Sequence, residues 1–374
     1  MRNTIIDNMR GLCMLGVIGI HIGSLALAPD NFTLYLLLEI LSRYSVPSFF
    51  FISGYGLACT DKGLLANGKL QFFDFMKKRL RGAGLPYLSW SLFYLLYFWL
   101  ILPPGFVSWN PLHVAFVLFF GLGCYHLYFM VILLWFYGTY PLWRKLLRII
   151  IHHNIPFMLV LLFIFQLFFN WWTTHPGLNT AGWSVLAKNF FDYRLNYLPL
   201  HYLLIFISGG LAAIYWDKFI AKLRKHSAAV TAFYLATIAY DVYSCYDAVK
   251  SKGYSLLDLA NTYHQLSPQG LLYTIGSILF FCFALDWLER RARQSMAYKA
   301  ISTLSAYSML IYFVHPLLLD WITSAYNHFG IIMTVKKVAF SYVLLVLASL
   351  VLSIGLTHIF ARSSLLRLLF TGKK

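Results

Sequence analysis

Ten apolar runs recur along this chain, each long enough or nearly long enough to cross a lipid bilayer. A spanning helix needs about 20 mostly apolar residues, and about 17 suffice where flanking side chains reach the interface. The composition agrees, because 60% of the 374 residues are hydrophobic and only 11% are charged. We therefore expect an all-α polytopic membrane protein, with one integral-membrane domain over residues 1–374 and no separate soluble domain. The expected spans are 11–28, 34–58, 85–102, 113–142, 156–171, 197–216, 229–246, 268–287, 303–325 and 337–360.

Lysine and arginine are concentrated in every second loop between these runs. Cytoplasmic loops of membrane proteins are enriched in these residues, so the alternation predicts a bundle of ten helices with both termini in the cytoplasm. The even number of spans also predicts that the first run is retained rather than removed as a signal peptide. A net charge of +17 alone is compatible with nucleic-acid binding. The scatter of basic residues among loops, with no nucleic-acid-binding motif, argues against such a partner.

The first span carries two ionisable side chains on one helical face. Arg10 and His21 are eleven residues apart, which corresponds to a rotation of about 1100° and a rise of roughly 16 Å. Arg10 is then near the cytoplasmic surface and His21 near the bilayer centre, where an ionisable group is costly and usually functional. Asp7 can orient the Arg10 guanidinium from three residues away. Alternatively, Arg10 is a surface anchor and His21 a structural hydrogen-bonding group.

The opposite face of the first span is formed by small residues, Gly16, Gly19 and Gly23. Small residues at this spacing allow neighbouring helices to approach closely. We therefore expect this face to be packed and the Arg10 and His21 face to line a cavity.

The second span also carries polar side chains. Glu39 and Arg43 are one helical turn apart, in the order that favours an ion pair. The pair is either structural, or Arg43 faces the same cavity as His21. Pro47 removes a helix hydrogen bond and predicts a kink or break. Ser53 supplies a hydroxyl near the cytoplasmic end of the span.

Four basic residues within five positions follow the second span in a predicted loop: Lys77, Lys78, Arg79 and Arg81. Such a cluster can bind an anion, including the phosphates of a coenzyme. It can equally be a topology determinant or a contact for lipid headgroups.

The ninth span has a polar stripe in an otherwise apolar helix. Ser308, Tyr312 and His315 lie within about 60° on one face, which we expect to point into the bundle. His126 in the fourth span is another candidate lining residue, although a structural histidine is an equal alternative. Trp172 belongs to an aromatic-rich outer loop, 172–196, which is typical of an interfacial belt and can also stack on a sugar.

Five stretches resemble, in order, the motifs of membrane acyltransferase family 3. They are residues 6–11 with His21, 45–55, 78–87, 126–129 and 312–316, and together they cover nearly the whole chain. The 42–47 version of the second motif resembles the branch that contains the enterobacterial common antigen O-acetyltransferase. One position departs from the family pattern, because Gly82 stands where the basic stretch usually has an arginine. Arg81 is the candidate substitute.

The resemblance implies transfer of an acyl group, commonly acetyl, from acetyl-CoA or another acyl-CoA to a hydroxyl of a cell-surface or lipid-linked glycan. It implies location in the bacterial cytoplasmic (inner) membrane, and it makes His21 and Arg10 the essential pair. We expect no metal and no permanently bound cofactor. Two alternatives remain, a transporter of a polar or anionic solute and a non-catalytic glycan-assembly scaffold. No internal repeat supports the transporter.

The expected mechanism assigns a role to each candidate. Phosphates of the donor bind Arg10 and the basic stretch, and the pantetheine arm follows the first span to His21, which is the general base. Arg43, Tyr312 or Ser308 stabilises the oxyanion, and Ser53 or His21 is a conceivable acyl carrier. The full assignment is catalytic for His21, Arg10, Arg43, Tyr312 and His315; donor-binding for Arg10, Lys77, Lys78, Arg79, Arg81 and Ser53; and acceptor-binding for Glu39, His126 and Ser308.

Overall fold

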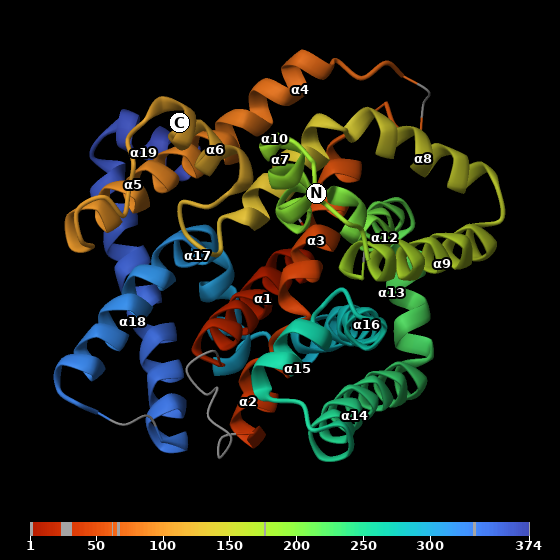
Figure 1. Cartoon of the computed structure of the whole chain (residues 1–374). Coiled ribbons are helices and arrows are strands. Elements are labelled where there is room, and N and C mark those ends of the chain that lie inside the picture. The colour runs from red at the N-terminus through yellow and green to blue at the C-terminus, as the bar shows by residue number, and fades with distance from the viewer. Residues whose placement is uncertain are drawn as a thin grey trace. The chain divides into compact units, whose positions relative to one another are not determined.

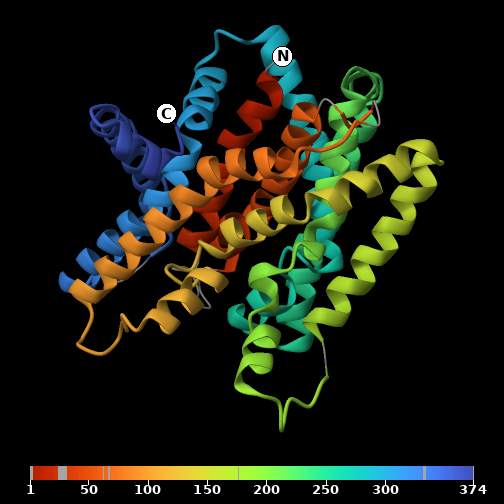
Figure 2. The same ribbon diagram turned by 90° about the horizontal axis from the view of Figure 1, so that it is seen from above.

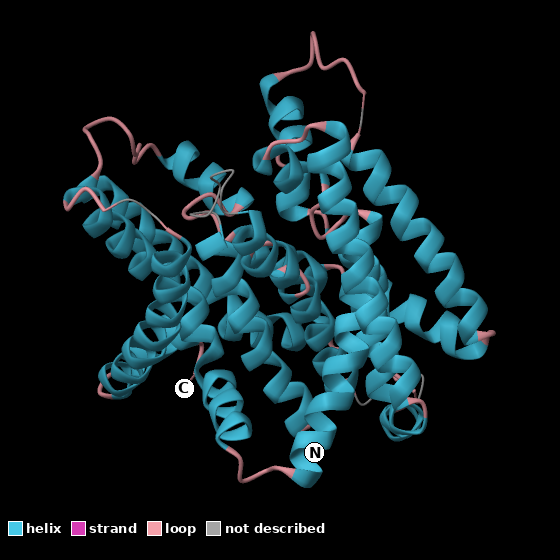
Figure 3. Cartoon of the chain, turned by 90° about the horizontal axis from the view of Figure 1, so that it is seen from below, coloured by secondary structure: helices cyan, strands magenta, loops and turns pink. Residues whose placement is uncertain are grey.

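All regular elements of the structure, a computed structural model, are helices (Figure 3). The structure describes residues 3–23, 32–61, 63–65, 68–175, 177–331 and 334–373, and no strand occurs within these ranges. Helices satisfy their backbone hydrogen bonds internally, as a bilayer requires. The predicted all-α polytopic class is therefore confirmed. The last residues of the expected first span, 24–28, lie outside the described ranges.

Seven helices among the described residues are long and apolar enough to cross a membrane. An eighth results if the helical segments Pro199–Ile214 and Trp216–Lys225, which meet at a bend of 99°, count as one broken span. The expected span 229–246 corresponds to one long helix, α14 (Ser227–Lys252), which is not among the seven. The number of crossings and the cytoplasmic location of both termini stay predictions.

The expected span 113–142 is wrong as a single helix. Helix α6 (Pro111–Phe120) ends at Gly121, whose φ of +70° is left-handed, and turns follow until α7 (Tyr128–Gly138) begins. A Cβ at Gly121 would lie 2.7 Å from Cα of Tyr128, so the chain folds back closely at this glycine. An apolar run alone does not reveal such a break.

The helices form two compact units. The first contains residues 1–60 and 205–355, and the second contains 61–204 and 356–374. The prediction of one integral-membrane domain stays a prediction. Besides α14, the elements of the first unit are α1 (Thr4–Gly23), α2 (Phe32–Leu38), η3 (Ile40–Ser42), α3 (Ser45–Thr60), most of α12 (Leu203–Ile214), α13 (Trp216–Lys225), α15 (Leu256–Thr262), α16 (Pro268–Arg291), α17 (Met296–His328) and most of α18 (Val335–Ala361).

Helix α1 is the central element of the first unit and packs against α17, α3 and α16 (Figure 1). Its glycines face its neighbours. A Cβ at Gly16 would lie 2.7 Å from Cβ of Ser45, and a Cβ at Gly23 would lie 2.9 Å from Cβ of Glu39. A Cβ at Gly19 would meet Oγ of Ser42. The predicted packing of this glycine face is therefore confirmed.

The second span is broken where its proline predicts. Between α2 and α3 the chain passes through the short 3₁₀ helix η3, and α3 begins two residues before Pro47. Pro47 therefore occupies the first turn of α3, where its missing N–H costs no helix hydrogen bond. Arg43 lies in the break itself.

The second unit contains the basic stretch. Helix α4 continues through a π-helical turn, η4, into α5, and Figure 2 shows α8 and α9 joined by a short turn. Besides α6 and α7, the elements of the second unit are α4 (Phe72–Arg79), η4 (Leu80–Gly84), α5 (Leu85–Ile101), α8 (Tyr140–His152), α9 (Ile155–Thr174), α10 (Val185–Asp192), α11 (Arg194–Tyr197), η5 (Pro199–Tyr202) and α19 (Ser364–Thr371).

The C-terminal segment packs on the π-helical turn. Gly372 follows α19 with a φ of +68°, and a Cβ there would lie 2.7 Å from the carbonyl oxygen of Arg81. The indole of Trp90 in α5 donates to the carbonyl of Phe370 at 3.2 Å. The chain end therefore supports the turn between the basic helix and α5.

The close approach of α3 and α12 gives a first testable prediction. A Cβ at Gly54 would meet the carbonyl oxygen of Phe206, and Gly209 would meet that of Phe51 in return. Gly54→Ala should lower the free energy of unfolding by about 1–3 kcal/mol, measured by thermal unfolding in detergent. The matched control is Gly56→Ala in the same helix, where nothing lies within 4 Å of a Cβ. Equal stability of the two variants would contradict the packing.

Candidate functional site

His21 of α1 stacks on His315 of α17. The two ring centroids are 5.2 Å apart and the ring planes are inclined by 25°. His315 is fully buried, and its Nδ1 lies 3.0 Å from the carbonyl oxygen of Ile311. A carbonyl oxygen only accepts, so this contact places a proton on Nδ1 of His315. Two predicted site residues, from opposite ends of the sequence, are thus brought together.

The polar stripe of α17 extends from this pair. Tyr312 lies one turn before Pro316, and its ring centroid is 6.4 Å from that of His315. Ser308 lies one turn before Tyr312, and the side chains of Ser308 and Tyr312 are both buried. Helix α17 continues through Pro316, but Pro316 has no N–H to donate to the carbonyl of Tyr312, so one backbone hydrogen bond is missing beside the histidine pair. The prediction that this stripe points into the bundle is confirmed.

Arg10 lies toward the N-terminal end of α1 and is partly exposed. Its Nη1 is 3.5 Å from Oδ1 of Asp7, so the predicted pairing of these two residues is confirmed. The side chain of Arg10 is 44% exposed, which leaves its guanidinium accessible to another anion. Helix geometry places it roughly 16 Å from His21 along the axis.

The guanidinium of Arg43 contacts Glu39 and the C-terminal end of α15. Its Nη2 pairs with Oε1 of Glu39 at 3.0 Å and lies 3.4 Å from the carbonyl of Ala260, while its Nη1 donates to the carbonyl of Tyr263. A cation at the last carbonyls of a helix is favourable. These contacts support the alternative in which the Glu39 and Arg43 pair has a structural role. A catalytic role for Arg43 and an acceptor contact for Glu39 stay predictions.

Helix α15 is also fixed at its other end. Ser255 and Asp258 form a capping box, with the Asp258 N–H donating to the Ser255 hydroxyl at 3.1 Å and the Asp258 carboxylate accepting from the Ser255 N–H at 2.9 Å. Hydrogen bonds from Ser255 hold the pKa of Asp258 below its ordinary value. Leu256 and Leu259 pack into a core with Tyr35.

Ser53 lies in α3 and is partly buried. Two residues on, the phenol oxygen of Tyr55 accepts a hydrogen bond from Nδ2 of Asn3 at 2.7 Å, and its ring meets that of Trp216 edge-on. This end of α3 is thereby tied to the start of α1. The donor-binding role of Ser53 stays a prediction.

The basic stretch is helical, so the expectation of a loop is wrong. Lys77 and Lys78 are exposed on α4, whereas Arg79 and Arg81 are partly buried. The guanidinium carbon of Arg79 is 5.3 Å from the ring centroid of Phe75 and 5.6 Å from that of Tyr137. These residues belong to the second unit, and their joint contact with Arg10 to one donor stays a prediction.

His126 also belongs to the second unit. It lies in the turns before α7 rather than in a span, it is 2% exposed, and its ring meets the Tyr94 ring edge-on at 5.6 Å. Its acceptor-binding role stays a prediction. Trp172 of α9, Phe190 of α10 and Arg194 of α11 line a cavity of about 260 Å³. The expectation that residues 172–196 form a loop is therefore wrong at these helices, and their outer location stays a prediction.

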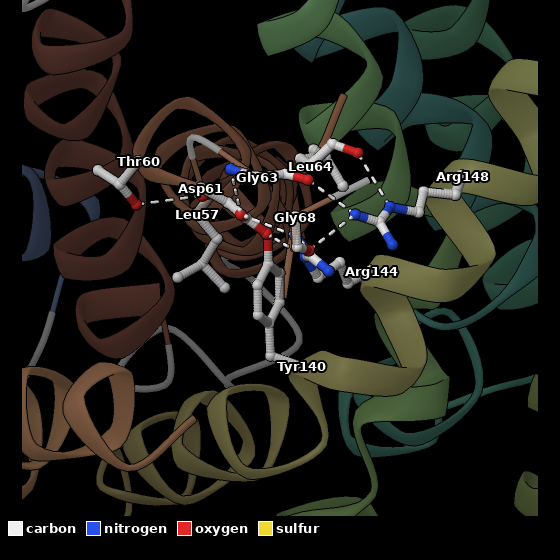
Figure 4. Close-up of polar contacts among 9 residues, drawn as sticks. All are labelled: Leu57, Thr60, Asp61, Gly63, Leu64, Gly68, Tyr140, Arg144 and Arg148. Atoms are coloured by element: carbon white, nitrogen blue, oxygen red, sulfur yellow. Dashed lines mark hydrogen bonds and ion pairs between the residues drawn. The ribbon is translucent and has the colours of Figure 1, made fainter. Parts of the chain in front are cut away.

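Sequence reasoning missed a polar cluster in the second unit, drawn in Figure 4. Asp61 accepts from Arg144 through both carboxylate oxygens, at 2.5 and 3.2 Å, and the Tyr140 hydroxyl lies 3.3 Å from the same carboxylate. Arg148, one turn beyond Arg144, joins the cluster. The only signal in the sequence was the spacing of Arg144 and Arg148, which places them on one face of an amphipathic helix. Their positive charge was interpreted only as a determinant of membrane topology.

Comparison with known proteins gives one match. The model of the family described as "Acyltransferase domain" matches residues 3–362. No curated protein and no solved structure matches the chain.

The buried ion pair gives a second testable prediction. Arg43→Met leaves the Glu39 carboxylate buried without its cation and should lower the free energy of unfolding by about 3–5 kcal/mol, measured by thermal unfolding in detergent. The double variant with Glu39→Gln should lose less than Arg43→Met alone. The control is Arg10→Met, whose exposed pair should contribute about 0–1 kcal/mol. Equal losses for Arg43→Met and Arg10→Met would show that Arg43 does not hold this region.

Proposed function

The chain belongs to membrane acyltransferase family 3, and we propose that it transfers an acetyl group from acetyl-CoA to a hydroxyl of a cell-surface or lipid-linked glycan. Family membership and the apolar helices make the protein a multi-pass membrane acyltransferase. The acetyl donor, the glycan acceptor, the bacterial inner membrane and the resemblance to the enterobacterial common antigen branch belong to the proposal.

The stacked His21 and His315 pair carries this proposal. Acyl transfer to a hydroxyl needs a base that accepts the hydroxyl proton, and histidine is the side chain best suited to this near neutral pH. His21 lies on α1, which packs against α17, α3 and α16, and its ring stacks on the buried imidazole of His315. Histidine acts as a base in its neutral imidazole form.

In the proposed reaction His21 removes the proton from the acceptor hydroxyl. The hydroxyl oxygen attacks the thioester carbonyl, the carbon–sulfur bond breaks, and the coenzyme thiolate takes up the proton from the imidazolium. The products are the acetyl ester and free coenzyme A. Direct transfer needs no covalent intermediate on Ser53 or His21, so neither is required as an acyl carrier.

Tyr312 and Ser308 are the proposed donors to the oxyanion that forms on the thioester carbonyl. Both hydroxyls lie on the α17 face that carries His315. Arg43 is the weaker candidate, because its guanidinium already contacts Glu39 and two backbone carbonyls. Ser308 is also a proposed contact for the acceptor, together with Glu39 and His126.

The donor phosphates are proposed to bind Arg10 and the basic residues of α4 and η4. The exposure of Lys77 and Lys78 and the accessible guanidinium of Arg10 support this. Arginine binds phosphate oxygens through two parallel hydrogen bonds, whereas lysine contributes a mobile point charge.

A transporter is not favoured, because the matched family consists of acyltransferases. The two functions are separable by one assay on the purified protein. Radiolabelled acetyl-CoA should yield free coenzyme A and labelled glycan, whereas solute flux without acetyl-CoA would favour the transporter.

His21 gives the third testable prediction. His21→Ala should reduce acetyl transfer at least about 100-fold, because a positioned general base contributes about 10²–10⁴-fold. The measurement is coenzyme A release and glycan acetylation by membranes that contain equal amounts of inserted protein. The control is His113→Ala, which removes an exposed histidine of α6. Undiminished transfer by His21→Ala would overturn the assignment.

A further inference from the structure

We propose that Asp61, Tyr140 and Phe75 position the basic helix α4 so that Arg79 is held ready for the donor phosphates. The inference rests on the proposed donor-binding role of residues 77–81. The contacts concerned lie within the second unit and fix the position of α4, and they take no part in the acyl transfer itself. All of these residues are positioning residues, because they act through Arg79.

The start of helix α4 has one favourable local feature, the acidic Asp74 in its first turn, but no side-chain cap. The helix has eight residues, and Gln71 at its N-cap makes no side-chain capping hydrogen bond. A short uncapped helix is marginal on its own, and the end of a longer helical run frays in the same way. Contacts from other elements must therefore hold its first turns in place.

The segment before α4 is pinned to α8 by two arginines (Figure 4). The Asp61 and Arg144 side chains are 6% and 8% exposed, and their two-oxygen pairing is the strong geometry for a carboxylate and a guanidinium. Arg144 Nη2 also donates to the carbonyl of Gly68 at 2.8 Å. Arg148 donates to the carbonyls of Gly63 and Leu64 at 2.7 and 2.9 Å.

Gly63 leaves room for the approach of the Arg144 guanidinium to the backbone. A Cβ at Gly63 would lie 2.9 Å from Nη2 of Arg144 and 3.2 Å from Cα of Gly68. The Gly68 N–H in turn donates to the carbonyl of Gly63 at 3.0 Å. The segment is thus closed on itself and on α8 a few residues before α4 begins.

Tyr140 connects this cluster to α4. Its hydroxyl lies 3.3 Å from Oδ2 of Asp61, and its ring stacks on Phe75 with centroids 5.1 Å apart and planes inclined by 19°. The side chain is 1% exposed, so the stack excludes water from both ring faces. One buried side chain therefore fixes both the preceding segment and the second turn of the basic helix.

The ring of Phe75 contacts Arg79, which lies one turn along on the same face of α4, so the position of Phe75 helps to determine the position of the Arg79 side chain. The Arg79 guanidinium lies against the rings of Phe75 and Tyr137, which come from α4 and α7. Lys77 and Lys78, by contrast, extend from α4 into open space. Among the basic side chains of α4, Arg79 is therefore the one whose direction is set by contacts with other side chains, including the ring of Phe75.

The test compares two substitutions in the same helix. Phe75→Leu removes the stack on Tyr140, and Phe73→Leu makes the same change at a side chain that is 88% exposed. Full-length protein in detergent is assayed for equilibrium binding of radiolabelled acetyl-CoA, with competition by acetyl-pantetheine, which lacks the nucleotide phosphates. Phe75→Leu should weaken acetyl-CoA binding about tenfold and leave acetyl-pantetheine binding unchanged, while Phe73→Leu should change neither.

Further variants identify the source of any effect. Phe75→Tyr keeps an aromatic ring and should restore acetyl-CoA affinity. Asp61→Asn should weaken acetyl-CoA binding in the same selective way. Equal loss of both ligands in Phe75→Leu would indicate general misfolding rather than positioning and would overturn the inference, as would unchanged acetyl-CoA binding in Phe75→Leu.

Arg79→Ala separates this inference from the proposed function. If Arg79→Ala weakens acetyl-CoA binding and Phe75→Leu does not, Arg79 binds the donor and only the positioning role is wrong. If Arg79→Ala, alone and combined with substitution of Lys77 and Lys78, leaves binding unchanged, the donor site proposed for residues 77–81 is itself wrong.

Discussion

The close packing of α1 is the constraint on which the first unit depends. Glycines on one face of α1 allow the backbones of η3 and α3 to approach within contact distance, and Gly11 allows the same approach to α17. In a bilayer such contacts matter because lipid tails are as apolar as the side chains they replace, so association rests on fit and on hydrogen bonds. The enclosed position of His21 beside His315 follows from that fit.

Apolar length and helical periodicity were sufficient to predict the helical class and the common face of Ser308, Tyr312 and His315, and the missing N–H of Pro47 was sufficient to predict the break near it. They were insufficient at Gly121, because a left-handed residue inside an apolar run leaves no trace in hydropathy. They also failed for α4, since a run of basic residues between spans is typical of a loop. Its helical state depends on aromatic contacts with α7 and α8 that only the folded chain supplies.

In the candidate site, too, contacts between neighbours in the sequence were predictable and contacts between distant elements were not. Spacing within one helix predicted the pairing of Arg10 with Asp7 and of Glu39 with Arg43, because such pairs are local. The stacking of His21 on His315 joins helices almost 300 residues apart, and the pairing of Asp61 with Arg144 joins a turn to a distant helix. No periodicity encodes contacts of this kind, since they arise from packing rather than from helix geometry.

The π-helical turn Leu80–Gly84 has a consequence for how this part of the chain can vary. A π turn holds one residue more than an α-helical turn, so it is equivalent to a single-residue insertion in a continuous helix. Removing that residue would rotate α4 by about 100° relative to α5 and turn its cationic face away from its present direction. The turn thus sets the direction in which the cationic face of α4 points relative to the apolar helix α5 that follows.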